Sequence, residues 1–235
     1  MRRYTEKHPH QKGRSILDRI VLGGSDGIIE NLAATSALNG VQSLSYGAII
    51  VAGFSFAVAG AIAMFFSSYM SRQSELDSLR VDIERERLEI ETEPEEERME
   101  LTELLKKEGY TDREVSVIMQ RLEKNKEMWL RAQLRHELHL HIDELEHNPL
   151  KKAIPAGLAF FLFALFPVIP YFLGLERFLS LAVSIIFSVS LLFLLGSTKL
   201  LSIKNFNPRR GLESAILGAV AAFLLYFVGV VISYY

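Results

Sequence analysis

The sequence predicts an all-α integral membrane protein with five transmembrane helices and a cytoplasmic helical module inserted between the second and third. The chain is 49% hydrophobic but also 23% charged, so apolar and charged residues must occupy separate layers. No strand-like alternation of apolar and polar residues occurs in it. Four segments lack Asp, Glu, Lys and Arg and reach the roughly 20 residues needed to span a bilayer: residues 47–71, 153–175, 178–198 and 214–235.

The first predicted span, residues 16–41, carries charges within an otherwise apolar segment. Asp26 and Glu30 lie four residues apart, which puts both on one face of a helix. A carboxylate at the bilayer centre costs at least about 2.5 kcal/mol, so such residues face a protein interior or a wet cavity and mark an ion path. We therefore expect this pair to line a cation pathway.

The second span adds Met64, whose thioether is a soft, weak metal ligand, although packing is the more common role of a lone methionine. Small residues at positions 53, 57 and 60 of this span predict close helix packing. The third span contains three prolines, which predict a break or a kink: Pro155, Pro167 and Pro170.

The basic residues predict the orientation of the chain. Lysine and arginine gather in the tail before the first span and in the loop between the fourth and fifth spans. Such loops lie in the cytoplasm, so the N-terminus and the acidic segment are expected there and the C-terminus outside. The membrane is expected to be the cell membrane in a prokaryote and a vacuolar-type membrane otherwise.

Three domains follow from this division: a tail with spans one and two at 1–71, an acidic helical module at 72–151, and spans three to five at 152–235.

Within the acidic segment, a helix over residues 73–91 continues the second span and is predicted to end near Pro94. A final helix is predicted over residues 126–147. Two capping boxes predict the helix starts between them: Thr92 with Glu95, and Thr111 with Glu114.

Glutamates recur at helical spacing on both sides of Pro94, which leaves two interpretations. They form either a solvated acidic face or a hard-donor site for a cation. Like charges at this spacing destabilise a helix without a ligand, which favours the cation site. The repeated positions are Glu86, Glu89, Glu93, Glu97 and Glu100.

Histidines near the end of this segment add borderline donors, which suit iron, manganese or zinc. Glu137 lies among His136, His139 and His141 and is the candidate ligand there, whereas some of the histidines are expected on an exposed face. Leu140 stands where a zinc-protease helix would need its second histidine. A di-iron bundle needs two Glu-x-x-His pairs, and the sequence has one, at residues 144–147.

Other function classes lack their motifs. The sequence has no cysteine, no phosphate-cradling glycine loop, no nucleophile–base pair and no basic, aromatic surface for nucleic acid. We therefore expect no enzyme and no use of ATP, and an ion gradient is the natural source of energy.

Three motifs resemble the vacuolar iron transporter (VIT) family over nearly the whole chain. Residues 22–28, LGGSDGI, are similar to the Ser-Asp-Gly signature of the family's first span. Residues 59–64, AGAIAM, and 166–172, FPVIPYF, resemble runs of its second and third spans. Their order and spacing together are more specific than any one of them.

The resemblance implies a homodimer that moves Fe2+, and often Mn2+, out of the cytosol in exchange for protons. It implies that Asp26 and Met64 are ligands within the membrane. It also implies a set of cytoplasmic metal ligands, which by motif position are Glu86, Glu89, Glu97, Glu100 and Glu137.

The chain departs from the family pattern at several positions. Phe56 stands where many members have a glutamate, and Glu30 is the candidate replacement. Gln133 and Leu134 stand where the family has methionine ligands, which makes the cytoplasmic site harder and favours manganese alongside iron. Asn31 begins the stretch in which many members have a proline.

Our hypothesis from the sequence is a dimeric, proton-coupled exporter of Fe2+ or Mn2+, with Zn2+ and Co2+ as further cargo ions and no permanently bound cofactor. Metal and protons would compete for the same carboxylates. A membrane-anchored buffer or sensor is the alternative, and it needs no polar residue in the first span. An oxidase that stores ferric iron would need the missing second Glu-x-x-His pair.

Overall fold

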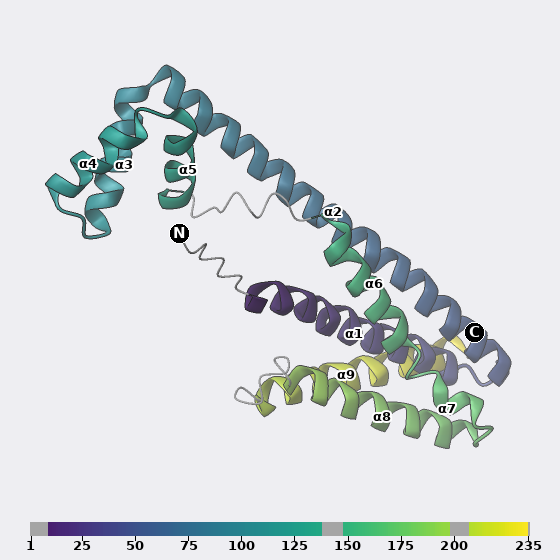
Figure 1. Ribbon diagram of the computed structural model, residues 1–235. Coiled ribbons are helices and arrows are strands. Elements are labelled where there is room, and N and C mark those ends of the chain that lie inside the picture. Colours follow the sequence, from purple (N-terminus) through teal and green to yellow (C-terminus); the bar gives the residue numbers. More distant parts are fainter. Residues whose placement is uncertain (1–8, 138–147, 198–206, 235) are drawn as a thin grey trace. The chain divides into compact units, whose positions relative to one another are not determined.

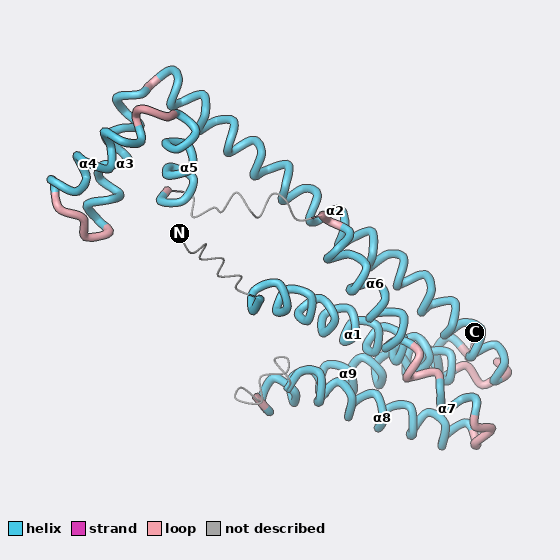
Figure 2. Tube along the Cα trace, viewed as in Figure 1, coloured by secondary structure: helices cyan, strands magenta, loops and turns pink. Residues whose placement is uncertain are grey.

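The structure, a computed structural model, describes residues 9–137, 148–197 and 207–234 (Figure 1). Every regular element among them is a helix, and the rest is turn and loop (Figure 2). The chain separates into an apolar unit, residues 1–70 and 149–235, and an acidic module, residues 71–148. The all-α prediction is therefore confirmed for the described residues.

Six helices contribute to the apolar unit. Three of them, α2, α8 and α9, are long and apolar enough to cross a membrane. The other two predicted spans differ, because α1 is interrupted by charged residues and α6 has only 15 residues. The helices are α1 Pro9–Gly40, the first half of α2 Tyr46–Thr92, α6 Leu150–Ala164, α7 Ile169–Phe172, α8 Arg177–Ser197 and α9 Pro208–Ile232.

Helix α1 packs against α6, α8 and α9. Its glycines permit the close approach, because a Cβ on Gly27 would lie 2.4 Å from the carbonyl oxygen of Phe160 in α6. Near the other end of α1, a Cβ on Gly40 would lie 2.4 Å from the carbonyl oxygen of Tyr226 in α9. The glycines of the Gly-Gly-Ser-Asp-Gly run thus serve helix packing.

The small residues of α2 also face a neighbouring helix, as predicted. Ala57 is fully buried against Phe160. A Cβ on Gly60 would lie 2.3 Å from the Phe160 ring, so only glycine fits there.

The third predicted span is broken, as its prolines predicted. Helix α6 ends at Ala164 and α7 begins at Ile169, with a turn between them (Figure 2). The Asn31 Nδ2 donates to the carbonyl oxygens of Ala164, at 2.6 Å, and Gly53, at 2.9 Å. The Ser184 Oγ donates to the Pro167 carbonyl at 2.7 Å. Side chains of α1 and α8 therefore satisfy carbonyls that the break exposes.

The loop between α1 and α2 has no charge of its own and is held by Arg177 at the start of α8. The Arg177 guanidinium donates to the carbonyl oxygens of Val41, at 2.8 Å, and Leu44. It also lies 6.0 Å from the ring centroid of Tyr46, whose hydroxyl donates to the Leu175 carbonyl at 2.8 Å. This cation therefore satisfies carbonyls after the end of α1.

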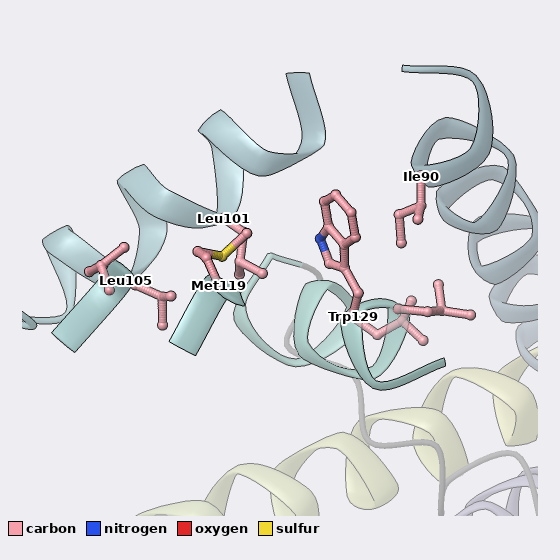
Figure 3. Close-up of a cluster of buried hydrophobic side chains, with 8 residues drawn as sticks. Ile90, Leu101, Leu105, Met119 and Trp129 are labelled. Carbon is pink, nitrogen blue, oxygen red and sulfur yellow. The ribbon is translucent and has the colours of Figure 1, made fainter. Parts of the chain in front are cut away.

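The acidic module contains the second half of α2, then α3 Pro94–Lys107, α4 Asp112–Leu122 and α5 Lys126–His136. Figure 3 shows its hydrophobic core, to which all four helices contribute. Trp129, the only tryptophan of the chain, is 5% exposed there. The other buried members are Ile90, Leu101, Leu105, Val115, Met119, Leu130 and Leu134.

One predicted capping box is confirmed and one is wrong. Glu114 donates its backbone N–H to the Thr111 Oγ1 and accepts from the Thr111 backbone at 2.8 Å, which completes the box of α4. Thr92 instead donates to the Leu88 carbonyl within α2, and α3 begins after Glu93 with no side-chain cap. Pro94 occupies the first turn of α3 and has no N–H that needs a cap.

Asn125 caps α5, which the sequence analysis did not predict; its side chain accepts from the backbone of Glu127 and Met128. Helix α5 ends at His136 with Glu137 as its C-cap, and residues 138–147, over which the helix is predicted to continue, lie outside the described residues.

Candidate metal centre

Three carboxylates of the acidic module meet at one point. They belong to Glu86 on α2, Glu97 on α3 and Glu137 at the end of α5. One oxygen atom of each lies within 4.8 Å of the others. Residues far apart in the sequence therefore offer converging oxygen ligands.

Helical spacing from the core explains how these side chains come together. Glu86 and Glu97 each precede a buried core residue by one turn, Ile90 and Leu101 respectively. Glu137 follows one turn after Gln133, whose neighbour Leu134 is 1% exposed in the same core. Packing of the core thus fixes the three helices and directs the acidic turns beside it toward one another.

Two of the three acids are buried, Glu137 is half-buried, and the cluster is incompletely hydrogen-bonded. Glu86 and Glu97 are 2% and 5% exposed, and Gln133 is fully buried. The Gln133 Nε2 donates to the Glu97 Oε2 at 2.7 Å and to the Glu137 Oε2 at 3.0 Å. The Glu86 Oε2 and the Gln133 Oε1 have no hydrogen-bond partner in the structure. Buried polar atoms are usually satisfied, so two acceptors remain free for a ligand.

Burial and mutual repulsion favour the protonated form of these acids. Burial first, and then the charges of Glu137 and Glu89, raise the pKa of Glu86 to about 7. Burial, followed by Glu86 and Glu100, raises the pKa of Glu97 to about 7. Near neutral pH the cluster therefore exchanges protons readily.

The pKa of Glu137 is also raised, mainly by burial and then by the charge of Glu100. The hydrogen bond from Gln133 opposes this shift because it stabilises the charged form.

This donor set suits a hard or borderline divalent cation. Carboxylate and amide oxygens are the ligands preferred by Mg2+, Ca2+ and Mn2+. A dication would replace the protons on the acids and relieve their repulsion. The arrangement can therefore take up a divalent cation and release protons as it does so.

The other two predicted cytoplasmic ligands lie at the edge of the cluster. Glu89 is half-buried and Glu100 is exposed. Both are near enough to act electrostatically on Glu86 and Glu97. Neither belongs to the group whose oxygens converge within 4.8 Å. The structure thus brings together three of the five predicted side chains and places two around them.

His136 is directed to a different partner. Its Nδ1 lies 2.7 Å from the Glu108 Oε1, which joins the end of α5 to the residue after α3. His139 and His141 lie outside the described residues. The described histidine of this run is therefore paired with an acid outside the cluster.

The predicted residues of the membrane pathway lie in the apolar unit. Asp26 is half-buried, and Glu30 is exposed one turn further along α1, close enough for the two charges to interact. Met64 lies on α2 and packs against the buried cluster of Ala57, Phe160 and Ala164, with the Ser68 Oγ 3.9 Å from its sulfur. The described residues contain no second convergence of three acidic or histidine side chains.

Gln133 is a member of the cluster whose position was not predicted from the sequence. From the sequence, this position indicated only the loss of a soft donor. Its spacing of four residues before Glu137 was the available signal, because that spacing puts both side chains on one helical face.

Comparison with known proteins gives a consistent result along the whole chain. The model of the VIT family matches residues 17–230. Vacuolar iron transporter 1 of Arabidopsis thaliana is 31% identical over 219 residues, which cover 93% of this chain and 86% of the relative. The vacuolar iron transporter of Centaurea cyanus is 29% identical over 220 residues, covering 92% and 87%. That of Plasmodium berghei is 28% identical over 241 residues, covering 97% and 86%.

The matched region contains all three motifs of the sequence analysis and every carboxylate of the cluster. A match of this extent, with similar coverage of relatives from plants and a parasite, establishes the relationship, and the chain belongs to the VIT family.

Proposed function

We propose that this chain is a multi-pass membrane transporter that captures Fe2+ from the cytosol and exports it. The buried convergence of Glu86, Glu97 and Glu137 carries the proposal, because it offers a dication several oxygen ligands at once. Family membership supports it, since relatives bear the name vacuolar iron transporter. As a member of a transporter family, the chain is not an enzyme.

The proposed topology has five spans, with α1 first and the broken pair α6 and α7 third. Support comes from the packing of α1 against α6, α8 and α9, because two of these partners are apolar enough to span a membrane alone. In this topology the N-terminus and the acidic module are cytoplasmic and the C-terminus lies outside. The proposed domains remain 1–71, 72–151 and 152–235.

The proposed pathway through the membrane uses Asp26, Glu30 and Met64, and it requires a homodimer. Glu30 is exposed on the single chain, and a carboxylate at membrane depth does not face lipid. A second copy would cover this side of α1. Phe56, which stands where many members of the family have a glutamate, is also exposed. Glu30 is therefore the candidate to replace the carboxylate that is missing from the second span.

Proton exchange is the proposed source of energy. A carboxylate must lose its proton to bind a dication, so metal entering a site releases protons from it. The same competition in the membrane would let a proton gradient drive metal out. The hard donors of the module favour Mn2+ as a second cargo ion, with Zn2+ and Co2+ as weaker ones.

Flux of Fe2+ into proteoliposomes under an imposed pH gradient tests the function. We expect gradient-dependent flux by the wild type and its loss in Asp26→Ala. Asp18→Ala is the matched control, because Asp18 is an exposed aspartate on the same helix, and it should transport normally. Metal binding without flux in the wild type would instead support the membrane-anchored buffer.

A further inference from the structure

Gln133 is a neutral side chain placed among acids. It is fully buried, and its Nε2 donates to one oxygen of Glu97 and one of Glu137. Its other terminal atom, Oε1, has no hydrogen-bond partner in the structure. An amide in this position satisfies two carboxylates with one nitrogen and leaves a buried acceptor unused.

The Nε2 atom of Gln133 contacts the oxygens that a bound cation would use. Two carboxylate oxygens contact this atom, at 2.7 and 3.0 Å, as they would contact a cation. The amide N–H groups carry the partial positive charge that keeps these oxygens together while no ion is bound. A dication would compete for the same oxygen lone pairs, and an N–H donor pointing at it would be repelled.

Rotation about the last torsion of the side chain resolves this conflict. The amide is flat, and the torsion that carries it is broad and roughly two-fold. A half-turn therefore exchanges Nε2 and Oε1 with little change in shape. The oxygen, already without a partner, would then face the cation as an additional hard ligand.

We propose that Gln133 is a reversible ligand of the metal centre, an inference that rests on the proposed function. In the empty site its nitrogen holds Glu97 and Glu137 together. In the loaded site its oxygen coordinates the ion, which shifts the relative affinity of the centre toward Mn2+ and Fe2+ compared with a soft donor at the same position.

Leu134 and His136, which lie near Gln133 on α5, are not placed to act as this ligand. Leu134 is buried in the hydrophobic core and has no donor atom. His136 is paired with Glu108. Among the described residues, Gln133 is therefore the non-carboxylate donor that touches the cluster.

The test titrates the full-length protein in detergent with Mn2+ alone and with Co2+ alone, followed by Trp129 fluorescence and by the visible absorption of Co2+. Gln133→Leu removes both amide atoms, and Gln133→Met replaces them with one soft donor of similar length. Gln120→Leu is the matched control, because Gln120 is exposed on α4.

We expect Gln133→Leu to weaken Mn2+ binding about tenfold or more. Gln133→Met should weaken Mn2+ binding similarly but Co2+ binding less, so the ratio of the two affinities shifts toward Co2+ and the Co2+ spectrum changes. Gln120→Leu should match the wild type. If Gln133→Leu unfolds the module, seen as a red-shifted Trp129 emission, the metal preference of Gln133→Met decides.

Unchanged Mn2+ affinity in Gln133→Leu, or an unchanged Mn2+ to Co2+ ratio in Gln133→Met, would overturn this inference alone. Failure of the wild type to bind either ion would instead overturn the capture step of the proposed function.

Discussion

The acidic module and helix α1 both carry carboxylates that are costly to bury, but they arrange them differently. In the module, three helices each supply one acid, and the acids converge in a buried cluster bridged by an amide. On α1, Asp26 and Glu30 come from one helix, and Glu30 is exposed on the single chain. The acids of the module therefore meet within one chain, whereas Asp26 and Glu30 have no comparable convergence among the described residues.

The strongest test of this comparison replaces two acids of the cluster in the module. Glu86→Ala with Glu97→Ala should weaken Mn2+ binding about a hundredfold, since each lost contact is worth about 1.4 kcal/mol. Flux at saturating metal should persist, because Asp26 and Glu30 are untouched. Trp129 fluorescence measures the binding and proteoliposomes measure the flux. Complete loss of flux at every metal concentration would mean that the two sites are not separable.

The pH dependence of stability tests the burial of the cluster. The pKa of Glu86 and of Glu97 is raised to about 7 from 4.5. The folded state thus binds more protons than the unfolded state in this range, so stability is full below pH 4.5 and is lost as the pH rises through 7. Without metal, the module should lose about 3 kcal/mol for each of these two acids between pH 4.5 and 7.5.

Urea unfolding of the full-length protein, followed by Trp129 fluorescence, measures this loss. Glu86→Gln with Glu97→Gln should flatten the profile, because glutamine does not titrate. A stability that increases with pH over this range would contradict the burial of these acids.

A smaller effect separates the converging acids from those at the edge. Glu97→Gln should weaken Mn2+ binding about tenfold, whereas Glu100→Gln should weaken it only about threefold, because an exposed charge acts through solvent. Isothermal titration of the two variants gives the ratio. Equal losses would place Glu100 among the direct ligands.

The smallest effect is expected at His136, which is paired with Glu108. His136→Gln should leave the Mn2+ affinity within about twofold of the wild type, by the same titration. A tenfold loss would show that the histidine leaves Glu108 to bind the metal and that the module uses a nitrogen ligand.

Sequence reasoning went furthest where a local rule decides the structure. Prolines predicted the break between α6 and α7, and Thr111 with Glu114 predicted the start of α4. The rule failed at Thr92, because Pro94 shifted the cap position to Glu93.

The metal centre could be predicted only in part. Helical spacing selected the glutamates, but spacing alone could not show that Glu97 is buried and Glu100 exposed. That difference depends on how the helices pack around Leu101 and Trp129, which is a long-range property. The role of Gln133 was missed for the same reason, since Glu97 lies on another helix, 36 residues away.

Asn31 makes α1 resistant to rotation about its own axis. Its amide is bonded to α2 and α6 at once, and it is adjacent in sequence to Glu30. Any rotation of α1 about its own axis would break both bonds, and Asn31 is only 1% exposed, so water could not readily replace them. Asn31 therefore fixes the rotational position of α1 against α2 and α6, and with it the direction in which the neighbouring Glu30 points.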